Sequence, residues 1–182
     1  MAYTFQTDST HQWLTEDQPL VYGTVVGNKA TLYGVLVELS VTRGPYSQQK
    51  AALTDANKYF KVELDELTKA DSGRVFVRAL EGDGGYYDID TAINATDTTV
   101  EATHTHGDVE HSRTTFYGLI DEEFVKFSVD GTTITFINRG LWGSLATSHA
   151  QNANLYELHN VTTLKPYYSW RVIDPSILPE GV

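Results

Sequence analysis

The sequence contains no cysteine and one methionine, and it has only 13 lysine and arginine residues against 24 aspartate and glutamate residues. Without cysteine, the chain has no disulfide, no thiolate metal site and no cysteine nucleophile. The formal net charge of −11 argues against a surface that neutralises nucleic-acid phosphates. It argues equally against binding to anionic lipid. We therefore expect neither nucleic acid nor a membrane as a partner.

Long apolar runs are also missing. No stretch approaches the ~20 residues that a membrane-spanning helix needs. The opening residues, MAYTFQTDSTHQW, have neither the basic start nor the apolar run of a secretion signal, so we expect no export by that route. The 182 residues suffice for one domain with a substantial core.

Aromatic residues are plentiful, with 11 Tyr and 7 Phe, and this composition favours strands. Short alternating runs between turn residues predict a mainly β, sandwich or barrel-like domain of about nine antiparallel strands. The runs that fit this pattern are 20–26, 29–40, 59–64, 74–80, 99–106, 114–120, 123–129, 132–137, 154–159 and 166–173. We expect a single domain over 1–182, with extended arms at 1–19 and 174–182 around a β core at 20–173.

Two other segments are expected to lack strands. Residues 46–56 are rich in helix-forming Gln, Lys and Ala and are the main helix candidate. Residues 81–98 contain several glycines and acids and are predicted to be the loosest part of the core.

Two dipeptides predict hairpins. Gly27-Asn28 would join 20–26 to 29–40, with Tyr22 opposite Tyr33. Asp130-Gly131 is the stronger signal, and it would place Phe127 opposite Ile134.

The segment after the second hairpin is unusual in composition. After a break at 138–140, Ser144 is a candidate N-cap for a short helical turn over 145–150. Arg139 offers up to five donors to loop carbonyls or an acid, and the two ring nitrogens of His149 can join two backbone groups. We predict a rigid structural or interface loop held by side chains, in which Trp142 packs on the domain or docks a neighbour. Its residues are Arg139, Gly140, Trp142, Gly143, Ser144 and His149.

This segment resembles an element of the tail-tip, hub and baseplate proteins of tailed bacteriophages. The element is a strand, Arg-Gly, two variable residues, Gly with Thr or Ser, alanine-rich positions, His-Ala and a small-residue turn. The residues that carry it here are Arg139, Gly140, Gly143, Ser144, Ala146, His149, Ala150 and Ala153, with Asn152 in place of a glycine. The resemblance implies a non-enzymatic virion component, made in the host cytoplasm, that assembles with itself and other virion proteins. No cofactor and no small-molecule substrate are expected.

An alternative interpretation is a metal site. His104 and His106 share one strand face, with Glu110 and His111 close behind. The spacing is similar to that of cupins, metal-binding β-barrels that include enzymes, with His149 as the late ligand. Thr98 stands where a glycine is expected, and the second cupin motif is absent.

Three further patterns are weaker. The acids Glu81, Asp83, Asp88 and Asp90 suit calcium by type but match no EF-hand spacing. A hydrolytic triad of His149 with Ser144 or Ser148 lacks a nucleophile elbow. An aromatic sugar-binding platform, which would make the chain a carbohydrate-binding module, lacks the paired polar cluster of such sites. Its candidate residues are Trp13, Trp142, Tyr167, Tyr168 and Trp170.

Overall fold

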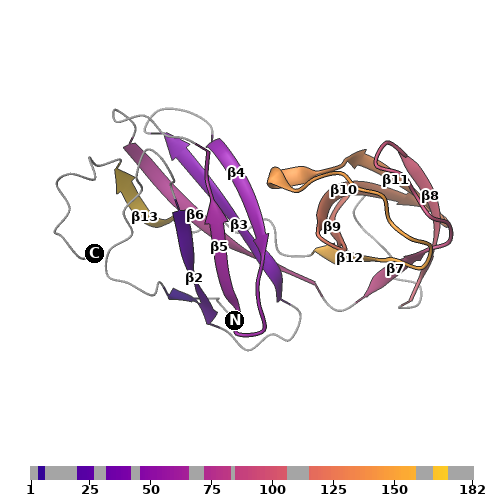
Figure 1. Cartoon of the computed structure of the whole chain (residues 1–182), viewed down its shortest axis with the longest axis horizontal. Helices are drawn as coiled ribbons and strands as arrows, with labels where there is room; N and C mark the ends of the chain where they lie inside the picture. Colours follow the sequence, from indigo (N-terminus) through magenta and orange to yellow (C-terminus); the bar gives the residue numbers. More distant parts are fainter. Residues whose placement is uncertain are drawn as a thin grey trace. The chain divides into compact units, whose positions relative to one another are not determined.

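A computed structural model describes residues 4–6, 20–26, 32–41, 46–65, 72–82, 85–105, 115–158 and 166–171. Contacts within the chain group it into two compact units, and each contains antiparallel β-sheet (Figure 1). The first unit contains 1–30, 34–79 and 162–182, and the second contains 31–33 and 80–161. Among the described residues, none of the helices has the length and apolar character that crossing a membrane requires.

The first unit has a three-stranded and a four-stranded sheet. The three-stranded sheet has the order β1 (Thr4–Gln6), β2 (Leu20–Val26), β5 (Tyr59–Glu63). The four-stranded sheet has the order β13 (Pro166–Arg171), β6 (Ser72–Glu81), β3 (Leu32–Val41), β4 (Tyr46–Leu53). Along β5, Phe60 and Val62 are buried while Lys61 and Glu63 are exposed, as the two-residue period of a strand requires.

The hairpin predicted at Gly27-Asn28 is wrong. β2 pairs with β1 on one side and β5 on the other, so Tyr22 lies opposite Lys61 rather than Tyr33. β3 belongs to the other sheet, where it lies between β6 and β4. A two-residue turn signal is local, whereas the choice of sheet is made by non-local pairing.

The helix predicted over 46–56 is also wrong, because this segment forms β4. Its glutamines serve tertiary contacts. Gln49 Nε2 donates to Glu38 Oε1 at 2.7 Å, and Gln48 exchanges two hydrogen bonds with the backbone of Asp65. Helix propensity is a weak preference that such contacts override.

The second unit is a closed barrel of six strands. Around the barrel the order is β10 (Glu123–Asp130), β11 (Thr133–Asn138), β8 (Thr99–His104), β7 (Tyr86–Ile89), β12 (Asn154–Leu158), β9 (Phe116–Ile120). Each strand runs antiparallel to both neighbours. The prediction that 81–98 lacks strands is wrong, since β7 lies within it and completes the barrel.

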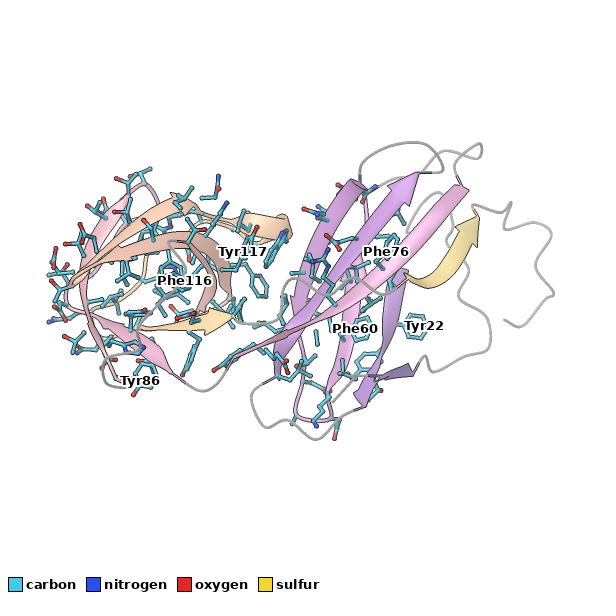
Figure 2. All side chains as sticks on the ribbon, turned by 180° about the vertical axis from the view of Figure 1, so that it is seen from behind. Tyr22, Phe60, Phe76, Tyr86, Phe116 and Tyr117 are labelled. Atoms are coloured by element: carbon cyan, nitrogen blue, oxygen red, sulfur yellow. The ribbon has the colours of Figure 1, made fainter. Side chains whose placement is uncertain are left out.

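Apolar side chains fill the barrel interior. Phe127 is fully buried in this core, with its ring centroid 5.5 Å from that of Phe116 and 5.8 Å from that of Tyr87. Figure 2 shows Phe116 inside the barrel, while the next residue, Tyr117, points outward. A barrel of this size is closed by its own side chains and leaves no wide channel.

The hairpin predicted at Asp130-Gly131 exists, but its register is shifted. Asp130 pairs with Thr133 and Phe127 pairs with Phe136, so the loop consists of Gly131 and Thr132. Gly131 has a φ of 61°, the sign that glycine adopts at the first position of a type II′ turn. A shift of two residues leaves every side chain on its predicted face.

The mainly β, antiparallel and barrel-like fold class is confirmed. The single domain over 1–182 stays a prediction, because two compact units can belong to one domain or to two. Within the predicted arm at 1–19 the structure describes only β1, and the arm at 174–182 lies outside the described residues.

Candidate functional site

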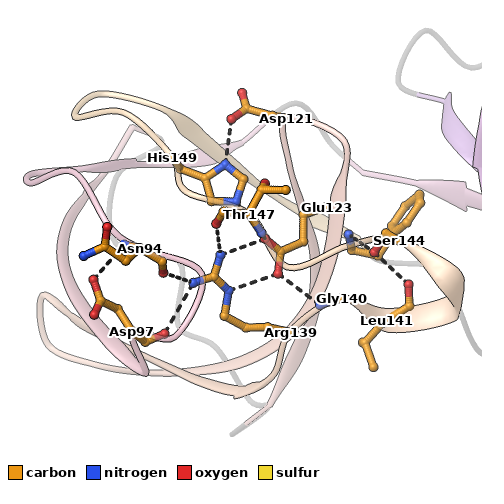
Figure 3. A network of polar contacts seen from close by, with 11 residues as sticks. Asn94, Asp97, Asp121, Glu123, Arg139, Gly140, Leu141, Ser144, Thr147 and His149 are labelled. Carbon is orange, nitrogen blue, oxygen red and sulfur yellow. Dashed lines mark hydrogen bonds and ion pairs between the residues drawn. The ribbon is translucent and has the colours of Figure 1, made fainter.

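Three connections meet at one end of the barrel. Because all neighbouring strands are antiparallel, β7, β9 and β11 end where β8, β10 and β12 begin. The connections 90–98, 121–122 and 139–153 therefore share this end. A network of polar contacts joins all three (Figure 3).

The Glu123 carboxylate is the centre of this network. Its side chain has no exposed surface, and its two oxygens receive five contacts. Oε1 accepts from Arg139 Nε and from the Gly140 amide, both at 3.0 Å. Oε2 contacts Arg139 Nη2 at 2.7 Å, His149 Nε2 at 2.8 Å and the Thr147 amide at 3.1 Å. A carboxylate has about four lone-pair sites, so its acceptor capacity is fully used.

These donors decide the protonation state of the carboxyl. Burial by itself raises the pKa of Glu123. The hydrogen bonds from Arg139 and His149, followed by those from the Thr147 and Gly140 amides, outweigh it and hold the pKa below its ordinary value. Glu123 is therefore a buried anion, paired in a bidentate manner with the Arg139 guanidinium.

Arg139 connects the carboxylate to the other loops. Besides its two contacts with Glu123, Nη1 donates to the Asn94 carbonyl at 2.6 Å and the Asp97 carbonyl at 3.4 Å. Nη2 donates to the Thr147 carbonyl at 2.6 Å. Each of the five guanidinium N–H groups thus has a partner, in the acid and in loop carbonyls.

His149 is buried and spans two carboxylates. Nδ1 lies 2.7 Å from Asp121 Oδ2, and Nε2 lies 2.8 Å from Glu123 Oε2. The prediction that the ring joins two backbone groups is wrong. Its backbone instead forms an isolated β-bridge with Ile93, through mutual hydrogen bonds of 2.9 and 3.0 Å. Each ring nitrogen of His149 is thus within hydrogen-bonding distance of one carboxylate oxygen, so the ring links the β9–β10 turn to the buried Glu123.

The residues between Arg139 and His149 adopt a different local structure from the predicted one. A 3-10 turn, η1 (Leu141–Gly143), precedes residues 144–148, which have no regular secondary structure, and there is no helical turn over 145–150. Ser144 follows η1 instead of capping a helix. Its hydroxyl donates to the Leu141 carbonyl at 2.8 Å and accepts from the Phe124 amide at 3.0 Å.

Three residues in 140–143 have a positive φ, namely Gly140, Trp142 and, at 89°, Gly143. Gly140 has a φ of 62°, and a Cβ there would lie 3.0 Å from the Ala146 amide nitrogen. Trp142 has a φ of 54°, which is uncommon for a bulky residue. Its ring stacks on Tyr117 with a centroid distance of 5.1 Å and packs on Phe124 at 5.6 Å. These ring contacts offset the backbone strain and attach the connection to the outer side of β9 and β10.

The metal alternative loses its late ligand in this arrangement, because both nitrogens of His149 contact carboxylates. The His104 ring packs on Tyr87, with centroids 4.6 Å apart. His106, Glu110 and His111 lie outside the described residues. Within the described part of the chain, no cluster of three His, Cys, Asp or Glu side chains is arranged to hold a metal ion.

Among the described residues, the acidic pattern and the serine–histidine pattern are not brought together into a site, and the aromatic pattern lies mostly outside them. Glu81 is buried at the end of β6, Asp88 lies on β7, Asp90 is exposed, and Asp83 lies outside the described residues. Neither ring nitrogen of His149 contacts a serine. Trp13 and the side chains of Tyr167, Tyr168 and Trp170 are not described.

Glu123 is not among the predicted site residues, although the sequence contains a signal for it. Glu123 has the same strand parity as Val125 and Phe127, which face the core. An acid in phase with apolar residues indicates a buried charge that needs a partner. No such signal marks the other members of the network. Asp121 contributes its side chain from a turn, which has no strand periodicity, whereas Asn94 and Asp97 contribute only backbone carbonyls to Arg139.

No known protein family, curated protein or solved structure matches this chain.

Proposed function

We propose that this chain is a non-enzymatic structural component of a tailed-bacteriophage virion, in the tail, baseplate or neck. It acts by assembling with copies of itself and with neighbouring virion proteins, after synthesis in the host cytoplasm. It needs no cofactor and no small-molecule substrate for this role.

The Glu123–Arg139–His149 network is the observation that supports the proposal. The residues that carry the resemblance to tail-tip, hub and baseplate proteins include those that hold this connection in place. Arg139 and His149 contribute side chains to the network, Gly140 contributes an amide and the backbone turn, and Ser144 binds the start of β10. The motif residues thus hold the 139–153 connection in one geometry, and a protein that works by assembly needs contact surfaces of fixed geometry.

The chemistry of the network also favours a structural role. Its buried ionisable groups, Glu123, Arg139 and His149, are satisfied by one another, by Asp121 and by backbone groups. A general acid or base must instead reach a reacting group with a free lone pair or proton. Such a network holds loops in one geometry, and a rigid loop is suited to repeated contacts between subunits.

The proposal is tested in a phage that encodes the chain. We expect mass spectrometry to find the protein in purified particles, and deletion of its gene to leave incomplete particles that the wild-type gene restores. Trp142→Ala and removal of 174–182 should each impair this rescue, because they remove a candidate docking side chain and an arm. Trp142→Phe is the matched control, since it keeps an aromatic ring on Tyr117 and Phe124.

The proposal is wrong if complete, infectious particles form without the gene and contain none of the protein. Circular dichroism of each purified variant separates a failure to assemble from a failure to fold.

A further inference from the structure

The exposed surface of the β11–β12 connection carries no charge. Only two residues of 139–153 are ionisable, Arg139 and His149, and both side chains turn inward, with exposed fractions of 9% and 1%. The exposed acid that reaches this connection, Asp121, is paired with His149. We name the exposed residues the neutral face: Gly143, Leu145, Ala146, Thr147, Ser148, Ala150, Gln151 and Asn152.

One large apolar side chain stands out on the neutral face. Leu145 is 78% exposed, compared with 44% for Ile137 and 38% for Leu53. Gly143 and Ala146, which lie within two residues of Leu145 in the chain, have small side chains and are also exposed. The neutral face thus presents one exposed leucine close to small residues.

The backbone under the neutral face is held at several points. The Thr147 amide donates to Glu123, and the Thr147 carbonyl accepts from Arg139. The His149 backbone pairs with Ile93, and the Asn152 amide donates to the Ile89 carbonyl at 2.8 Å. A surface that is already ordered loses little conformational entropy when it binds, so it is well suited to an interface.

We propose that the neutral face is a self-association surface, where it meets the same face of a second copy of this chain. Each copy has a net charge of −11, so contacts through acidic surfaces are opposed by repulsion. An uncharged face avoids that repulsion, and interface cores are depleted of charged residues. In a two-fold contact, each Leu145 lies over the small residues of the other copy, as a self-complementary patch requires. This inference rests on the proposed function and names a partner for it.

Cross-linking tests the contact directly, because the chain has no cysteine of its own. Ala146→Cys places a single thiol on the neutral face, and Thr135→Cys places one on an exposed position of β11. With a short bismaleimide, we expect Ala146→Cys to give a product of twice the 20.3 kDa chain mass, and Thr135→Cys to give little. Equal yields from the two variants over a dilution series would overturn the proposal.

Sedimentation equilibrium measures the strength of the contact. We expect wild-type chain to self-associate and Leu145→Glu to raise the dissociation constant by at least about tenfold, because it places two like charges in the contact. Leu53→Glu makes the same substitution at an exposed leucine of β4, and it should leave the constant unchanged. A wild-type chain that stays monomeric, or variants with equal constants, would contradict the self-contact.

Particle incorporation separates this inference from the proposed function. If Leu145→Glu self-associates normally but no longer enters particles, the neutral face binds a different virion protein and the inference is wrong while the function stands. If the contact is found but the protein is absent from particles, the proposed function fails and the self-contact remains.

Discussion

In the described part of each unit, a buried glutamate meets an arginine, and the two pairs differ in how many groups contact the carboxylate. In the barrel, Glu123 contacts Arg139 through both oxygens and receives three further contacts from Gly140, Thr147 and His149. In the first unit, Glu38 on β3 meets Arg78 on β6 at 2.6 Å and Gln49 on β4 at 2.7 Å. Both carboxylates are almost fully buried.

The opposite pKa shifts of the two glutamates show the effect of the surroundings. Burial raises the pKa of Glu38 above its ordinary value, although Arg78 and Gln49 oppose that shift. Burial also acts to raise the pKa of Glu123, but its larger set of donors lowers the pKa overall. A single opposite charge thus does not by itself lower the pKa of a buried acid, whereas several directed hydrogen bonds together with such a charge do.

The largest expected effect is that of Glu123→Gln. This change leaves the buried Arg139 without its counter-ion and should lower the free energy of unfolding of the barrel by about 3–5 kcal/mol. Glu38→Gln in the first unit should lower stability by only about 1–3 kcal/mol. Amide hydrogen exchange resolved to β10 and β3 measures the two units separately. Equal losses in both units would remove the distinction between the two pairs.

Arg139→Lys should have the next largest effect, a loss of about 2–4 kcal/mol, although it keeps the positive charge. An ammonium group has three donors and no planar fork, so it cannot serve Glu123 and the Asn94, Asp97 and Thr147 carbonyls together. Exchange at β10 gives the loss. An Arg139→Lys chain as stable as wild type would show that charge alone holds the network.

Gly140→Ala tests the turn beneath the network against Gly131→Ala in the β10–β11 loop. Both glycines have a φ near 60°, at 62° and 61°. A Cβ at Gly140 would lie 3.0 Å from the Ala146 nitrogen and 3.1 Å from the Ser144 carbonyl oxygen, whereas a Cβ at Gly131 meets no atom within 4 Å. We expect a loss of about 1 kcal/mol at Gly131 and about 2 kcal/mol or more at Gly140.

Urea unfolding of the two glycine variants, followed by Trp142 fluorescence with Trp13 and Trp170 replaced by Phe, provides this comparison. If the two losses are the same, backbone conformation explains both, and the close packing around Gly140 adds nothing.

The smallest effect is a pH dependence of opposite sign in the two units. The lowered pKa of Glu123 means that its stabilisation is present above the ordinary pKa of 4.5 and is lost as the pH falls through the folded-state pKa. The raised pKa of Glu38 means that its ionisation destabilises the fold as the pH rises above 4.5. Hydrogen exchange at several pH values, with Glu123→Gln and Glu38→Gln as references, should show the two contributions disappear separately. If the free energy of unfolding changes with pH in both variants as it does in the wild type, other groups cause the pH dependence.

Part of this structure follows from local sequence patterns. The strands with clear alternation, such as β2, β5, β10 and β11, lie close to where the pattern predicts them, because a two-residue period with one buried face is a local property. Arg139 and His149 were also identified as the residues that hold the 139–153 connection, because polar side chains in an apolar, small-residue loop need buried partners.

Only the tertiary structure decided which strands pair and which acid these residues bind. β2 and β3 enter different sheets despite a good turn between them, and β4 is a strand despite its helix-forming composition. Glu123 meets Arg139 and His149 because closing the barrel brings three connections to one end. Such pairings join residues far apart in the chain, and no local periodicity or propensity encodes them.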